Sequence, residues 1–109
     1  MTHIKTIDLR EGFMIQLEGH ADTAPYGKDP VCAALSAYVY LIRDVLLQVE
    51  PLGDLNFASV TIEKGYAQFY ATGQGQVRNM LMTLYHAVVK GLRTLSKQYP
   101  KAVTLEVEK

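Results

Sequence analysis

The chain contains one cysteine, Cys32, which follows His20 by twelve residues. An imidazole beside a thiol can take its proton, and the resulting thiolate is a strong nucleophile toward carbonyl carbons. Cys32 also follows the pair Asp29-Pro30, which is typical of the start of a helix. The amides of a first helical turn favour a negatively charged sulfur and could also hold the oxygen of an attacked carbonyl. The pair therefore indicates nucleophilic catalysis, with His20 as acid and base.

Each of these residues also has an ordinary structural explanation. Free cysteine is among the most often buried residue types, so Cys32 could simply fill the core. His20 could be a loop residue without a chemical role, and Asp29 could serve only as a helix cap. Ser36 lies one turn after Cys32 on the same helical face, where it could bond the thiol or a backbone carbonyl. The residue types alone leave both explanations open.

Length and composition predict one globular domain, residues 1–109, with 49% hydrophobic residues. A single cysteine forms no internal disulfide and no paired-cysteine metal motif, which predicts a reducing, cytoplasmic setting without metal or organic cofactor. The 11 basic and 11 acidic residues are interleaved, so we expect no direct nucleic-acid binding. We expect neither a signal segment nor an apolar run long enough to cross a bilayer.

Hydrophobic periodicity predicts seven elements in the order ββαββαβ. Alternating residues indicate a hairpin over 4–18 with its turn at Glu11-Gly12, and a polar, mobile loop follows Gly19. We expect a helix over 30–48, a second hairpin over 57–72, another helix over 76–98 and a last strand over 102–107. This order predicts an α/β (α+β) fold, in which a mixed sheet carries both helices on one face. The first helix is apolar nearly all round, which favours a homodimer that covers it.

One stretch of the chain resembles a known family. Its segments are Gly19-His20-Ala21, Tyr26-Gly27-Lys28-Asp29, Val31-Cys32-Ala33-Ala34 and Ser36. The string is similar to that of the ribosomal-processing cysteine protease family Prp, and the resemblance extends over essentially all 109 residues.

The resemblance implies a catalytic pair and a substrate. Cys32 would be the nucleophile and His20 the proton donor, with Asp29, Ser36, Gly19 and Gly27 in supporting positions. Members of the family are small, often dimeric enzymes that remove a short N-terminal extension from a large-subunit ribosomal protein, cutting after an aromatic residue. The loop between histidine and cysteine would close on the bound peptide.

Pro30 departs from the family pattern, which has a bulky aliphatic residue there. A proline stiffens the segment that enters the helix, so it bears on the fit of the substrate more than on the chemistry of the thiol. Three alternatives stay open at this point. The chain could be a non-catalytic peptide-binding module for ribosome assembly, a structural homodimer, or a phage-encoded relative with another protein substrate.

Overall fold

The computed structural model describes residues 1–21, 24 and 27–109. The described residues do not include Tyr26 or positions 22, 23 and 25. Part of the family string and part of the predicted mobile loop fall on these positions. The elements in chain order are β1 (Thr2–Asp8), β2 (Gly12–Glu18), α1 (Pro30–Val49), a short 3-10 helix η1 (Glu50–Leu52), β3 (Leu55–Glu63), β4 (Tyr66–Gly73), α2 (Gly75–Gln98) and β5 (Val103–Glu108). The predicted order ββαββαβ is confirmed.

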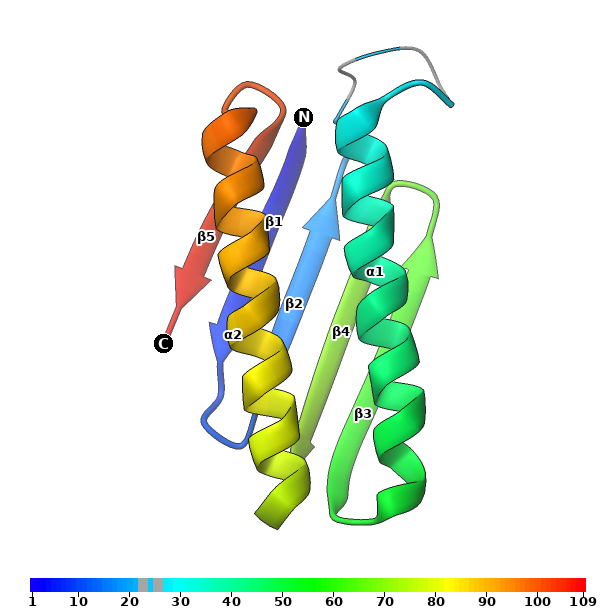
Figure 1. The fold of residues 1–109 in the computed structure, drawn as a ribbon, viewed down its shortest axis with the longest axis vertical. Helices are drawn as coiled ribbons and strands as arrows, with labels where there is room; N and C mark the ends of the chain where they lie inside the picture. Colours follow the sequence, from blue (N-terminus) through cyan, green and yellow to red (C-terminus); the bar gives the residue numbers. More distant parts are fainter. Residues whose placement is uncertain (22–23, 25–26) are drawn as a thin grey trace.

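The five strands form one mixed sheet in the order β3-β4-β2-β1-β5. β1 and β5 are parallel, and the other neighbouring strands are antiparallel. Both helices lie on the same face of the sheet, as predicted, with α2 over β1 and β2 and α1 toward β4 and β3 (Figure 1). This arrangement places the start of α1 at the same end of the molecule as the end of β2 (Figure 1).

The core lies between the helices and the two central strands. Phe13 and Ile15 of β2 pair with Ala71 and Phe69 of β4, and all four side chains are buried. Alternate residues of a strand point to one face, so these pairs present a continuous apolar surface to the helices. The helices contribute the buried residues Val31, Leu35, Ile42, Leu46, Val49, Val77, Leu81, Tyr85, Val88 and Leu92.

The first turn differs from its prediction. Gly12 is the first residue of β2, and the left-handed residue of the turn is Arg10, with φ 69°. The amide of Arg10 donates to Oδ1 of Asp8 at 2.8 Å, which supports this conformation. A Cβ on Gly12 would lie 1.8 Å from the carbonyl oxygen of Ala71. The glycine is therefore required by the approach of β4, a contact that the local sequence does not reveal.

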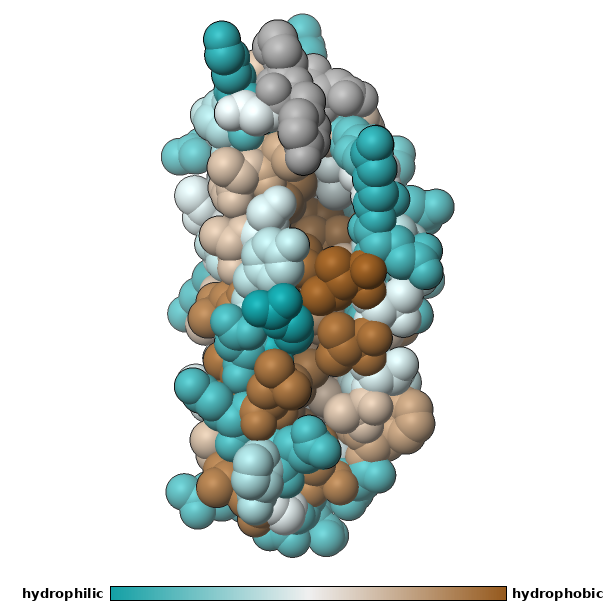
Figure 2. Space-filling view, turned by 90° about the vertical axis from the view of Figure 1, so that its right-hand side faces the viewer, coloured by the Kyte–Doolittle hydropathy of each residue, from teal (hydrophilic) through white to brown (hydrophobic). Residues whose placement is uncertain are grey.

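The length and composition of α1 contradict the expectation that no segment could cross a bilayer. A stretch of 18 residues within residues 30–52 has a mean hydropathy of 1.5, and among the described residues this is the one helix that could cross a membrane by length and composition alone. In the fold its inner side packs on the sheet, while Tyr40 and Leu47 are 48% and 60% exposed. Val60 and Ile62 of the edge strand β3 are 42% and 38% exposed. We call these four residues the α1–β3 patch; Figure 2 shows apolar surface gathered along the valley between the two elements.

Candidate active site

His20 follows the end of β2, where two other segments hold the chain. The amide of Gly19 donates to the carbonyl oxygen of Gly65 at 2.9 Å. The hydroxyl of Thr2 donates to the carbonyl oxygen of Gly19 at 3.4 Å. Gly19 has a φ of 97°, and a Cβ there would lie 2.3 Å from the carbonyl oxygen of Met1. The amide and the carbonyl group of Gly19 are thus both hydrogen-bonded. His20, the next residue, is exposed to solvent.

Cys32 is the third residue of α1, as predicted, and its position is fixed by a helix cap. Oδ1 of Asp29 accepts the amides of Val31 at 2.9 Å and of Cys32 at 3.1 Å. Pro30 has no amide hydrogen to offer, so this cap satisfies the second and third helical positions. The thiol of Cys32 is free and exposed. The explanation that Cys32 fills the core is therefore wrong.

The cap contradicts one expectation about the first helical turn. That turn was expected to hold the oxygen of an attacked carbonyl with its backbone amides. The amides of Val31 and Cys32 bond the Asp29 carboxylate, and the amide of Ala33 donates to the Asp29 carbonyl oxygen at 3.1 Å. While Asp29 caps the helix, these donors already have partners and are not available to a substrate oxygen. The sequence identified the cap and the amides but not their competition.

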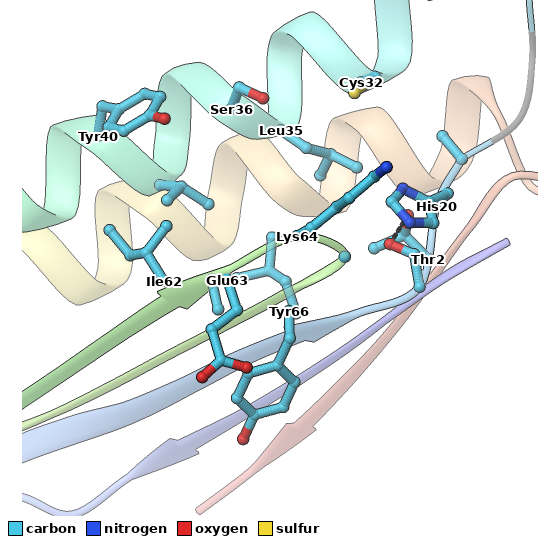
Figure 3. A pocket seen from close by; sticks show the side chains of 16 residues that line it. Thr2, His20, Cys32, Leu35, Ser36, Tyr40, Ile62, Glu63, Lys64 and Tyr66 are labelled. Atoms are coloured by element: carbon cyan, nitrogen blue, oxygen red, sulfur yellow. Dashed lines mark hydrogen bonds between the residues drawn. The ribbon is translucent and has the colours of Figure 1, made fainter. Parts of the chain in front are cut away.

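His20, Cys32 and Ser36 line one cleft between the start of α1 and the β3–β4 turn (Figure 3). The cleft has a volume of about 480 Å³. A second cavity, of about 310 Å³, adjoins the same three residues and extends toward Gly27 and Asp29. His20, Cys32 and Ser36, which all belong to the family string, therefore line both cavities. Their spacing in the sequence predicts this juxtaposition.

His20 and Cys32 lie on facing sides of the cleft and make no hydrogen bond with each other in the described part of the chain (Figure 3). A catalytic base must come within hydrogen-bonding distance of the proton that it takes. Such bonds are often long in the absence of substrate and tighten when it binds. Both side chains are exposed and sit at the entrance of the cavity. The arrangement is therefore compatible with a pair that closes around a peptide.

The β3–β4 turn contributes residues that sequence reasoning missed. Lys64 and Ile62 line the cleft, and Figure 3 shows the Lys64 side chain extending along it toward His20. Glu63 extends from the turn in the opposite direction, beside Tyr66 (Figure 3). The sequence signals only a hairpin turn here. Nothing local indicates that this turn would reach a histidine at the end of another strand.

In residues 1–21, 24 and 27–109, no three His, Cys, Asp or Glu side chains come close enough to hold one ion. The cleft combines a free thiol, an imidazole, a hydroxyl and an apolar floor that includes Leu35 and Ala67. A thiol and an imidazole are the groups that nucleophilic catalysis by cysteine requires.

The fold and this cleft define a small thiol-dependent peptidase, and comparison with known proteins identifies its family. The family model described as cysteine protease Prp matches residues 1–104. The chain therefore belongs to the Prp family of cysteine proteases. No curated protein matches it.

Solved structures share the fold at low sequence identity. The essential ribosomal processing protease Prp from S. aureus, in complex with a covalently linked product peptide, is 18% identical with a TM-score of 0.76, and the match covers 98% of this chain and 99% of that chain. The same protease in complex with a substrate peptide is 16% identical with a TM-score of 0.71, and the match again covers 98% of this chain and 99% of that chain. SMU.848 from Streptococcus mutans is 23% identical with a TM-score of 0.73, over 100% of this chain and 96% of that chain.

Proposed function

We propose that residues 1–109 form one catalytic domain that removes a short N-terminal extension from a large-subunit ribosomal protein. The observation that carries this proposal is the exposed thiol of Cys32 on the same cleft as His20, in a chain of the Prp family. The S. aureus relative is a ribosomal processing protease with a substrate peptide. A long open cleft between a helix and a hairpin suits an extended peptide end better than a folded surface.

In the proposed reaction, His20 accepts the proton of the Cys32 thiol, and Sγ attacks the scissile carbonyl carbon. The C–N bond of the tetrahedral intermediate then breaks, and His20 gives the proton to the departing amine. The N-terminal fragment remains on Sγ as a thioester. Water, losing a proton to His20, attacks the thioester, and the C–S bond breaks. The sulfur recovers its proton, so His20 ends the cycle as it began.

The supporting residues have structural parts in this proposal. Asp29 positions the helix start that carries Cys32, and Gly19 lets the chain turn after β2. Ser36 offers a hydroxyl one turn further along the cleft wall. Gly27 has a φ of 84°, a conformation that favours glycine, so it supports the backbone path before the helix start. None of these residues needs to touch the reacting atoms.

A cleavage experiment tests the proposed function. The wild-type protein and Cys32→Ser are incubated with a ribosomal protein that carries its N-terminal extension, and the products are weighed by mass spectrometry. We expect one cut after an aromatic residue with the wild type and none with Cys32→Ser. Ser59→Ala, at an exposed residue of β3 outside the cleft, is the control. Equal behaviour of wild type and Cys32→Ser would exclude the protease function, and a cut in a different protein would favour the phage-type alternative.

We also propose a cytoplasmic location, which the single cysteine favours. A second proposal is that the protein forms a homodimer. The α1–β3 patch exposes Tyr40, Leu47, Val60 and Ile62 on neighbouring elements, and exposed apolar patches mark sites of association. Tyr40 and Ile62 also line the cleft proposed for the peptide, so a second copy would cover the outer side of α1 around Leu47. Leu47→Glu should convert a dimer to a monomer in sedimentation velocity, whereas Leu52→Glu, also at an exposed residue, serves as the control. A monomeric wild-type protein would contradict the proposal.

A further inference from the structure

Gly65 lies in the β3–β4 turn, directly against the imidazole of His20. A Cβ built on Gly65 would lie 2.7 Å from Nε2 and 3.1 Å from Cε1 of His20. Contacts under 3.0 Å do not occur with a real side chain unless something moves. The ring therefore occupies the space that any side chain at position 65 would need.

The same turn also holds the backbone that precedes the ring. The carbonyl oxygen of Gly65 accepts the amide of Gly19 at 2.9 Å. One residue thus anchors the peptide before His20 with its carbonyl group and leaves room for the imidazole with its bare Cα. These two contacts act on adjacent atoms of the segment that delivers the ring to the cleft.

Turn geometry alone does not explain this arrangement. Gly65 has a φ of 74°, a conformation that favours glycine in any turn. Gly75 also has a positive φ, 59°, but the nearest atom to the position of its Cβ is Oδ2 of Asp54 at 3.8 Å, which is an ordinary contact. Of these two glycines, only Gly65 has another side chain in the space that a side chain of its own would need.

We propose that Gly65 is a positioning residue that sets the orientation of the His20 ring toward Cys32. The inference rests on the proposed role of His20 as acid and base. A side chain at position 65 would push the ring away from its place, and a displacement of about 1 Å can lower a rate by about 100-fold.

The experiment compares Gly65→Asn with Gly75→Asn. Asparagine tolerates positive φ better than most residues, so both segments should form, while only the first variant places a Cβ against His20. For cleavage of a peptide bearing the ribosomal-protein extension, we expect kcat to fall about 100-fold in Gly65→Asn with KM changed by less than about threefold. Gly75→Asn should behave as wild type. The matched pair Gly65→Ala and Gly75→Ala repeats the test without an added polar group.

One readout does not depend on activity. The ¹⁵N resonances of the His20 ring should shift in Gly65→Asn and not in Gly75→Asn, while those of His3 and His86 stay unchanged in both. The exposed ring is the end of a side chain that can move aside, so the shift should appear without a large loss of stability. Gly65→Ala and Gly75→Ala give the same comparison if Gly65→Asn fails to fold.

The outcomes separate the two proposals. Unchanged His20 ring resonances in both Gly65→Asn and Gly65→Ala would overturn the positioning role. A wild-type protein that cuts no peptide would overturn the proposed function, while the ring resonances would still measure the contact. Shifted resonances with an unchanged kcat would show that the ring moves without consequence for the reaction, which also overturns the positioning role.

Discussion

Asp29 holds the backbone of Cys32: its Oδ1 accepts the Cys32 amide at 3.1 Å and the Val31 amide at 2.9 Å. The carboxylate therefore orders the turn that carries the thiol. Asparagine caps a helix about as well as aspartate but has no charge, so it separates the hydrogen bond from the charge.

Replacement of Asp29 should distinguish the cap from the charge. Asp29→Ala removes the acceptor, so we expect a loss of about 1 kcal/mol in the free energy of unfolding. Asp29→Asn should retain most of that stability, because the side-chain oxygen of asparagine can still accept the two amides. Urea unfolding measures the free energy of unfolding of both variants. Equal loss of stability in both variants would contradict a role of the carboxylate oxygen as the cap.

Lys64 should favour anionic reagents at Cys32. Its side chain extends along the cleft toward His20 (Figure 3), and it forms no ion pair with the described residues. Two unit charges about 4 Å apart in water interact by about 1 kcal/mol, so the rate ratio of iodoacetate to iodoacetamide should fall about two- to fivefold in Lys64→Met. Lys90→Met, on the exposed side of α2, is the control and should leave the ratio unchanged. High salt should reduce the difference.

Gly12→Ala should destabilise the sheet. The added Cβ would meet the Ala71 carbonyl oxygen at 1.8 Å and the Thr72 Cα at 2.7 Å, and both are backbone atoms of a paired strand. Overpacking of this kind costs about 1–3 kcal/mol, so we expect a loss near the upper end in urea unfolding. Arg10→Gly, in the turn two residues earlier, should change stability far less, because Arg10 already has a positive φ. A mild Gly12→Ala variant would show that β4 can move away.

Tyr85 should make the protein lose stability at alkaline pH. Burial raises the pKa of Tyr85 above its ordinary value of 10.0, Asp8 acts in the same direction, and the hydrogen bond with Thr6 opposes them. The unfolded chain then releases this proton at a lower pH than the folded protein. The contribution is complete below pH 10, the ordinary value, and is lost as the pH rises through the folded pKa.

Tyr85→Phe provides the test. It leaves the buried Thr6 hydroxyl without its 3.0 Å partner, so we expect it to cost about 1–3 kcal/mol at neutral pH. The decline above pH 10 should be smaller than in wild type, whereas Tyr99→Phe, at an exposed site, should keep the wild-type decline. Urea unfolding at a series of pH values gives both results. An identical alkaline slope in Tyr85→Phe would exclude this tyrosine as the source.

The sequence by itself determined the elements and the helix start. Alternating apolar residues marked the strands, three- and four-residue spacing marked the helices, and Asp29-Pro30 placed the first turn of α1 correctly. These signals are local, since each depends on residues within one or two turns of the chain. The same proximity predicts that His20 and Cys32 meet, because only twelve positions separate them.

The tertiary structure decided what surrounds that pair. Gly12 faces β4, and Gly65 and Lys64 reach His20, because β4 pairs with β2 rather than with β1. These contacts join segments about forty or more residues apart, and their geometry follows from strand order and register, which no local pattern specifies. The exposure of Cys32 and the use of its amide by Asp29 likewise depend on how α1 lies on the sheet. Composition alone favoured a buried thiol, and only the packing of the helix placed it in the cleft.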